Sequence, residues 1–152
     1  MRKEKIEYFV NVLKETQKLS TCISKQVGCL IVRDGRILLS SYNGVASGMK
    51  HCNKRFNKYF DRDKHHEWSN ENELHSEQNI ISYAAKKGIK LENSIMYVTL
   101  SPCIHCSKLI LASGIKEVYY LESYDMDDSG IKFLNEREIK CIKIYPKTSV
   151  LN

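Results

Sequence analysis

Two short strings of the sequence contain side chains that can hold a metal ion and move protons. The first places His75 two residues before Glu77, and the second places Cys103 three residues before Cys106. An isolated Cys-x-x-Cys pair also suits a redox site or half of a structural zinc site, and an isolated His-x-Glu often occurs by chance. The two strings together supply one imidazole, two thiolates and one carboxylate, which is a far more specific set.

This set predicts a catalytic zinc site. A closed structural site needs a fourth Cys or His, whereas His75, Cys103 and Cys106 leave one position of the metal open for water. Zinc lowers the pKa of such a water toward neutrality. We interpret Glu77 as the general base and acid of the reaction. The alternative is that Glu77 is a fourth zinc ligand.

Secondary-structure patterns place both strings at the starts of helices. Because Glu77 follows His75 by two residues, the two cannot share a face of a regular helix, so we expect an irregular first turn or placement by the backbone. We expect Asp34-Gly35 to form a tight hairpin turn and 43–68 to be a long ordered loop or excursion. The expected helices are 4–19, Ser69 or Asn70 to Lys87, 103–112 (with Ser101 as N-cap and Pro102 at its first position) and 130–135, and the expected strands are 28–33, 36–42, 94–100, 117–122 and 141–145.

Length and composition predict one globular domain over residues 1–152. Hydrophobic residues make up 42% and charged residues 28% of the chain, so neither a disordered nor a low-complexity protein fits. The order of elements predicts an α/β fold, a three-layer α/β/α sandwich with a mixed five-stranded sheet.

The charge and the cysteine content narrow the range of binding partners and of cellular compartments that we expect for the protein. The 24 Lys and Arg against 18 Asp and Glu are scattered along the chain, which argues against binding to a nucleic-acid polymer. No apolar run is long enough to span a bilayer and no signal-type segment opens the chain, so we expect a soluble cytoplasmic protein without membrane partners. The six cysteines then favour metal or catalytic roles over disulfides, with Cys29 and Cys141 as small buried hydrophobes.

Over about residues 5–145 the chain resembles the deoxycytidylate (dCMP) deaminases, especially their phage and bacterial members. H-x-E followed by P-C-x-x-C is the signature of the zinc deaminases of nucleosides and nucleotides. The resemblance extends to SYNG at 41–44, NELHSEQNII at 72–81, MYVTLSPCIHC at 96–106, SGIKEVYY at 113–120 and ESYD at 122–125. It implies the cytidine deaminase-like fold and the hydrolysis of dCMP to dUMP and ammonia, which supplies thymidylate synthesis.

The resemblance also implies roles in substrate binding. Asn43 matches a residue at the sugar and phosphate end, and Tyr124 matches a tyrosine near the base and sugar. The backbone around Leu100 and Ser101 is implied to accept a hydrogen bond from the exocyclic amine. Lys25 is our candidate for the 5′-phosphate, and the alternative is an ordinary solvated lysine.

A second, structural zinc site is implied as well. Phage-type members carry one whose ligands resemble Cys22, Cys52, His65 and Glu73, and His66 competes with His65 for this role. Such a metal would stabilise a long loop that has few apolar residues.

Family members commonly form homohexamers that dCTP, with Mg²⁺, activates and dTTP inhibits. The apolar character of 80–85 and 117–122 suggests such an assembly. Ser41 and Ala46 replace a usual Gly and Pro in SYNGVASG, which leaves regulation open. Ser76 replaces the usual Ala between the zinc ligand and Glu77, which should leave the metal geometry intact.

Three other functions compete with this prediction. One is a deaminase of another cytosine nucleotide, and another is a deaminase of adenosine in tRNA. The YNG string and the weakly basic C-terminal segment YPKTSVLN argue against the tRNA enzyme. The third is a non-catalytic zinc scaffold, which would have no need of Glu77 as a proton shuttle.

Overall fold

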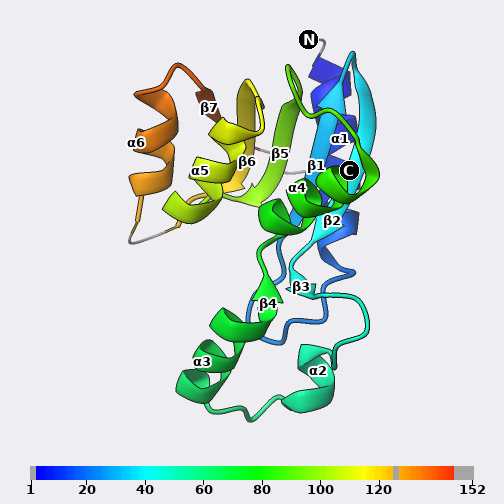
Figure 1. The fold of residues 1–152 in the computed structure, drawn as a ribbon, viewed down its shortest axis with the longest axis vertical. Coiled ribbons are helices and arrows are strands. Elements are labelled where there is room, and N and C mark those ends of the chain that lie inside the picture. Colours follow the sequence, from blue (N-terminus) through cyan, green and yellow to red (C-terminus); the bar gives the residue numbers. More distant parts are fainter. Residues whose placement is uncertain (1–2, 125–126, 146–152) are drawn as a thin grey trace, which may run out of the picture.

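A mixed five-stranded sheet forms the centre of the protein (Figure 1). The structure is a computed structural model that describes residues 3–124 and 127–145; Asp125 and residues 146–152 of the C-terminal segment lie outside the described residues. The sheet order is β2-β1-β5-β6-β7, with β1 antiparallel to both of its neighbours and β5, β6 and β7 mutually parallel. The strands are β1 (Gly28–Arg33), β2 (Arg36–Tyr42), β5 (Ile95–Leu100), β6 (Glu117–Glu122) and β7 (Lys140–Lys143).

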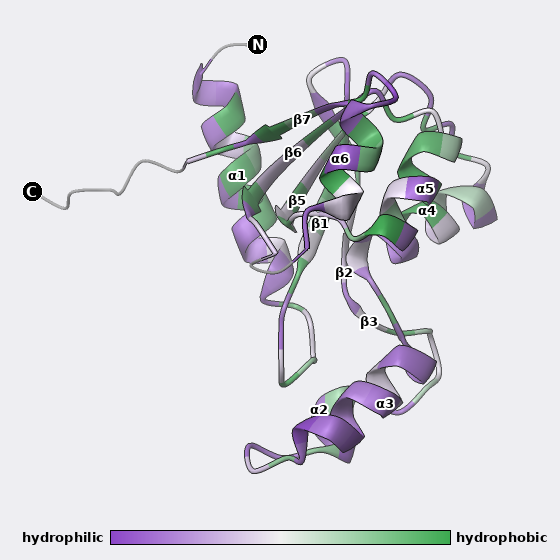
Figure 2. Ribbon diagram, turned by 90° about the vertical axis from the view of Figure 1, so that its left-hand side faces the viewer, coloured by the Kyte–Doolittle hydropathy of each residue, from purple (hydrophilic) through white to green (hydrophobic). Residues whose placement is uncertain are grey.

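Helices cover both faces of this sheet, which confirms the predicted three-layer sandwich (Figure 2). Successive residues of β1 alternate between the two faces, as the pleat of a strand requires. On one face, Leu30 and Val32 pack against Phe9 of the first helix. On the other, Cys29 and Ile31 belong to a core that the remaining helices complete. These helices are α1 (Lys3–Gln17) on the first face and α4 (Ser76–Lys87), α5 (Ile104–Ala112) and α6 (Ser129–Asn135) on the second.

Of the two interpretations of 43–68, the ordered excursion is confirmed and the loop is wrong, because residues 43–74 form a small lobe with its own helices and strands. The lobe projects beyond one end of the sheet (Figure 1). It contains β3 (Gly44–Val45), α2 (Cys52–Arg55), α3 (Arg62–Asn72) and β4 (Glu73–Leu74), and β3 pairs with β4. The apolar residues of α3 show no helical periodicity, because His65 is the one residue of this helix that is buried. Its start is specified locally by Asp61, whose side chain accepts hydrogen bonds from the N–H groups of residues 63 and 64.

Two predicted helix starts also need correction. The helix expected from Ser69 or Asn70 is interrupted by β4, and α4 begins at Ser76 with His75 as its N-cap. Likewise, the N-cap of α5 is Cys103 instead of Ser101. Both cap residues have extended backbones. Two metal-ligand candidates therefore lie immediately before a helix, where the chain changes direction.

The state of the cysteines and the length of the helices bear on the remaining predictions. All six cysteines are free thiols. Cys29 is fully buried, as predicted, whereas Cys141 is only partly buried. Among the helices of residues 3–124 and 127–145, none has the length and apolar character needed to cross a membrane.

Candidate active site

The starts of α4 and α5 bring three metal-ligand candidates together. His75 Nδ1 lies 3.6 Å from Cys103 Sγ and 3.4 Å from Cys106 Sγ. A nitrogen and a sulfur bound to one tetrahedral zinc lie roughly 3.6 Å apart, as follows from bond lengths of about 2.1 and 2.3 Å. The backbone N–H of His75 donates to Gln78 Oε1 at 2.8 Å, which orients the residue. The three side chains therefore fit a zinc ion, with Nδ1 as the imidazole ligand atom.

The hydrogen bond between Cys103 and Cys106 shifts the pKa values of the two thiols in opposite directions. A hydrogen bond from Cys106 lowers the pKa of Cys103 to about 3, and the His75 side chain contributes to the same shift. The same hydrogen bond, together with burial, raises the pKa of Cys106. The lowered pKa of Cys103 favours the thiolate, which is the form that binds a metal.

Glu77 lies beside this group in the first turn of α4. Its side chain is 4% exposed, and burial raises the pKa of the carboxyl group. The ligating atoms of His75, Cys103 and Cys106 lie within 4.8 Å of one another, and Glu77 is not a member of that group. Because His75 is an extended cap and Glu77 is helical, both reach the same pocket although they are two residues apart. Backbone placement, one of the two expected arrangements, accounts for the spacing.

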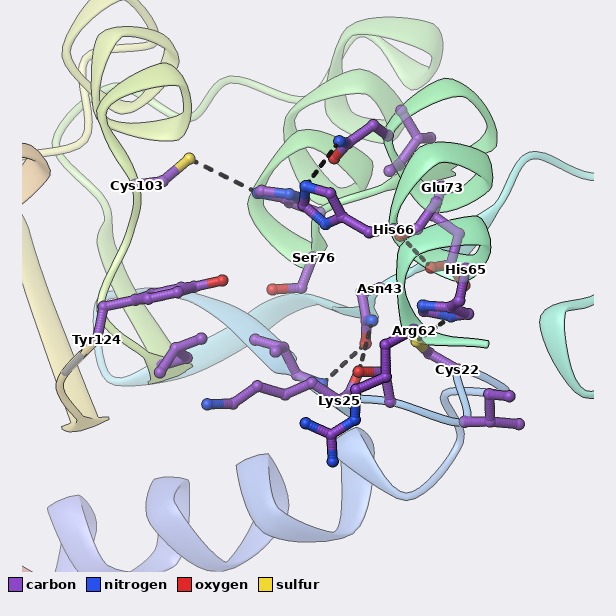
Figure 3. A pocket seen from close by; sticks show the side chains of 18 of the residues that line it. Cys22, Lys25, Asn43, Arg62, His65, His66, Glu73, Ser76, Cys103 and Tyr124 are labelled. Carbon is purple, nitrogen blue, oxygen red and sulfur yellow. Dashed lines mark hydrogen bonds between the residues drawn. The ribbon is translucent and has the colours of Figure 1, made fainter. Parts of the chain in front are cut away.

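A pocket of about 690 Å³ opens in front of Glu77 and His75. Its lining includes every residue predicted to bind substrate: Lys25, Asn43, Leu100, Ser101 and Tyr124. The backbone N–H of Tyr124 donates to Ser101 Oγ at 2.9 Å, which ties the segment after β6 to the segment after β5. Lys25 Nζ lies 5.6 Å from the centre of the Tyr124 ring (Figure 3).

Asn43 holds the segment that carries Lys25. Its Oδ1 accepts a hydrogen bond from the Val27 N–H, and its Nδ2 donates to the Lys25 carbonyl, both at 2.8 Å. An amide nitrogen has two hydrogens. One of them is therefore used to fix the segment, and the other is left for a ligand.

The sequence analysis missed a polar stripe of α3 that faces the same pocket. Arg62, His66 and Asn70 are spaced four residues apart, so they share a helix face, and all three line the pocket. Asn70 Nδ2 lies 3.2 Å from His66 Nε2. Two acidic residues of the lobe, Asp63 and Glu73, line the pocket as well. The four-residue spacing was visible in the sequence, but it has meaning only once 62–72 is known to be helical.

A second group of metal-ligand candidates joins the lobe to the segment before β1. Cys22, Cys52, His65 and Glu73 place their ligating atoms within 4.8 Å of one another. His65 Nε2 lies 3.8 Å from Cys22 Sγ and 3.3 Å from Cys52 Sγ. Glu73 Oε2 accepts a hydrogen bond from Ser69 Oγ at 2.6 Å, whereas Oε1 is buried without a hydrogen-bond partner. A buried carboxylate oxygen beside two thiols and an imidazole nitrogen fits a cation.

The surroundings of this second group suit a structural site. Burial raises the pKa of Cys22 and raises that of Cys52 to about 11, so a metal is needed to hold them as thiolates. The rings of Phe56 and Phe60 pack against His65, with centroids 5.2 and 5.1 Å from that of the imidazole. His66, the competing candidate, is exposed to the pocket instead.

The sandwich fold and a His-Cys-Cys group at paired helix starts, with a buried glutamate beside it, define the class of zinc-dependent deaminases. Residues 3–122 match the family model described as the cytidine and deoxycytidylate deaminase zinc-binding region. The chain belongs to this family.

Individual relatives agree with the assignment. The chain is 36% identical to the deoxycytidylate deaminases of Enterobacteria phages T2 and T4 over 143 residues, which covers 73% of this chain and 76% and 74% of theirs. The solved structure of dCMP deaminase from the cyanophage S-TIM5 in complex with dCMP and dUMP matches with a TM-score of 0.79 and 30% identity. That match covers 95% of this chain and 99% of the other.

Proposed function

We propose that this protein catalyses the zinc-dependent hydrolytic deamination of dCMP to dUMP and ammonia, which supplies the precursor of thymidylate. One observation carries the proposal: a single pocket joins the His75-Cys103-Cys106 group and Glu77 to cationic side chains at its other end. Its volume lies within the range of small-molecule sites. The phage relatives and the dCMP-bound neighbour support this choice of substrate.

The chemistry divides between the metal and Glu77. His75, Cys103 and Cys106 would hold the zinc ion, which would supply a water of lowered pKa as the nucleophile for C4 of the cytosine ring. Glu77 takes the proton that this water loses and delivers it to the ring nitrogen N3. Glu77, again unprotonated, then takes the second proton from the oxygen that has added to C4 and delivers it to the amino group, which leaves as ammonia as the C4–N bond breaks. The buried position of Glu77 keeps bulk water away from these transfers.

The remaining pocket residues orient the nucleotide. The backbone at Leu100 and Ser101 accepts from the exocyclic amine, and Tyr124 packs beside the base and sugar. The free amide hydrogen of Asn43 reaches the sugar and phosphate end. Lys25 and Arg62 approach that end from different elements, so they are our candidates for the 5′-phosphate (Figure 3).

Arg62→Ala tests the phosphate end. It is expected to raise KM for dCMP about tenfold, because a charge-assisted hydrogen bond to phosphate is lost, with little change in kcat. KM for deoxycytidine, which has no phosphate, should stay unchanged. Lys64→Ala removes a neighbouring exposed cation that does not line the pocket and serves as the control. Equal effects of the two variants on dCMP would contradict the role of Arg62.

We propose that the second group binds a structural zinc through Cys22, Cys52, His65 and Glu73. Four protein ligands close the coordination shell and leave no position for water. The metal would tie the lobe to the segment that carries Lys25, and it would hold α3 so that Arg62 faces the pocket. Both zinc groups need reduced thiols, which is why we place the protein in the cytoplasm.

We further propose a homo-oligomer, with a hexamer favoured, that binds dCTP with Mg²⁺ as activator and dTTP as inhibitor. The support differs from the sequence expectation. Within the expected segment 80–85, Ile80 and Ala84 are each 1% exposed and belong to the core, so its exposed apolar side chain is Tyr83. Tyr83 on α4 and Leu109 on α5 remain exposed, and these two helices pack together.

Light scattering at micromolar concentration is expected to show particles well above the monomer mass. Tyr83→Lys with Leu109→Lys should shift them toward monomers, because paired charges in an apolar contact are costly. If effector sites span subunits, dCTP with Mg²⁺ should make a sigmoidal dCMP saturation curve more hyperbolic. A monomeric wild type would contradict assembly, and superimposable curves would contradict regulation.

Ammonia release from a panel of substrates tests the function itself. The panel comprises dCMP, dCTP, deoxycytidine and an adenosine-containing tRNA stem-loop. We expect the highest kcat/KM with dCMP. Preference for another cytosine compound or for tRNA would replace the proposed substrate, and no release from any of them by zinc-loaded protein would favour a scaffold.

A further inference from the structure

Two serine hydroxyls connect the sheet to Glu77 through two separate hydrogen bonds, one to the backbone of Ser76 and one from its side chain. Ser76 Oγ donates to Glu77 Oε2 at 2.9 Å. Ser41 Oγ, from β2, donates to the backbone carbonyl of Ser76 at 2.7 Å. The H-x-E signature leaves the middle position unspecified, so neither serine is required by it.

These two hydrogen bonds lie in the interior of the protein. The exposed fractions of Ser41, Ser76 and Glu77 are 7%, 0% and 4%. Bulk water therefore competes little for these hydrogen bonds, and each is stronger than it would be at the surface. A hydroxyl that donates to a charged carboxylate belongs to the stronger class of hydrogen bonds.

The contact has a direct consequence for proton transfer. A glutamate side chain rotates about three bonds and carries two equivalent oxygens. The Ser76 hydroxyl holds Oε2 and so favours one orientation of the carboxylate that takes up and delivers the proton. Ser41 anchors the backbone of Ser76, the first residue of α4, to the sheet. This contact fixes the position from which the Ser76 hydroxyl reaches Glu77.

We propose that Ser76 is a positioning residue that fixes the carboxylate orientation of Glu77 for proton transfer, and that Ser41 fixes the backbone from which Ser76 acts. This inference rests on the proposed deamination. Neither serine takes part in the proton transfers themselves. Ser41 acts through the backbone of Ser76, and Ser76 acts through the carboxylate of Glu77.

Ser76→Ala is the decisive variant, because it removes only the hydroxyl and leaves a good helix former at the start of α4. We expect kcat for dCMP to fall about tenfold while KM stays within about twofold. Zinc content should be unchanged. Crystal structures of the wild type and the variant provide a readout besides activity: one carboxylate orientation of Glu77 in the wild type and more than one in the variant.

Two further variants sharpen the test. Ser41→Ala should lower kcat about threefold, and the double variant should be no slower than Ser76→Ala, because both changes act through one carboxylate. Ser94→Ala is the matched control. Ser94 is fully buried and its hydroxyl donates to the Leu91 carbonyl, away from the pocket.

Wild-type kcat in Ser76→Ala, or a loss of the same size in Ser94→Ala, would overturn the positioning role. A loss of zinc in Ser76→Ala that matches the loss of kcat would overturn it too, since the effect would then lie in the metal site. Failure of the proposed function is distinct: the wild type itself would then release no ammonia from dCMP. The crystallographic orientation of Glu77 would still test the contact in that case.

Discussion

Glu77→Gln is expected to lower kcat for dCMP deamination by about a thousandfold while the fold and the zinc content are retained. The reason is that glutamine keeps the size and polarity of the side chain but cannot take up and return a proton. The His75-Cys103-Cys106 group does not include Glu77, so the metal should stay bound. Steady-state kinetics together with elemental analysis measure the two effects separately.

Glu7→Gln is the matched control, because Glu7 is an exposed glutamate of α1 outside the pocket. It should leave kcat and KM unchanged. Turnover of Glu77→Gln at the wild-type rate would remove Glu77 from the mechanism. Loss of zinc in this variant would instead favour its alternative role as a ligand.

The second large effect is expected when both cysteines of the lobe group are replaced. Elemental analysis should find about two zinc ions per wild-type chain and about one in the Cys22→Ser, Cys52→Ser variant. Without the metal, Glu73 Oε1 and His65 are buried beside each other with no cation, which destabilises residues 43–74. KM for dCMP should rise at least about tenfold, because Arg62 and Asn70 lose their support.

Hydrogen exchange locates this effect, and faster exchange should be confined mainly to residues 43–74. Cys141→Ser changes a partly buried cysteine that belongs to neither metal group, so it should keep about two zinc ions and the wild-type KM. Retention of two metals in the double variant would refute the proposed ligands.

Local patterns in the sequence were sufficient for most of the sandwich. Two apolar runs and the Asp34-Gly35 turn between them predict the hairpin, and both turn residues have the positive φ that the pair favours. The helix of residues 76–87 ends at Gly88, whose positive φ ends helices at low cost. These features depend on interactions between residues near one another in the chain.

The candidate catalytic centre could also be predicted from the sequence, because this combination of residue types has few other common functions. The spacing of His75, Glu77, Cys103 and Cys106 indicates zinc and a proton shuttle before any fold is known. The signature describes which groups are present, but it does not describe how they are aimed. That His75 and Cys103 are extended cap residues, and not helical ones, came only from the structure.

The helical structure of the lobe and the lining of the pocket depend on tertiary contacts that the sequence pattern does not show. Apolar periodicity reports burial against a core, and α3 buries only His65, so its sequence has no period to detect. Arg62 belongs to the pocket because this helix lies across from the segment that carries Lys25, and Ser41 reaches Ser76 across 35 residues of chain. The sequence by itself predicts the sheet, the candidate metal ligands and the candidate proton shuttle, since each depends on residue type and short spacing. Only the folded chain decides which distant side chains line the pocket and which one anchors the backbone of Ser76, because that depends on long-range packing.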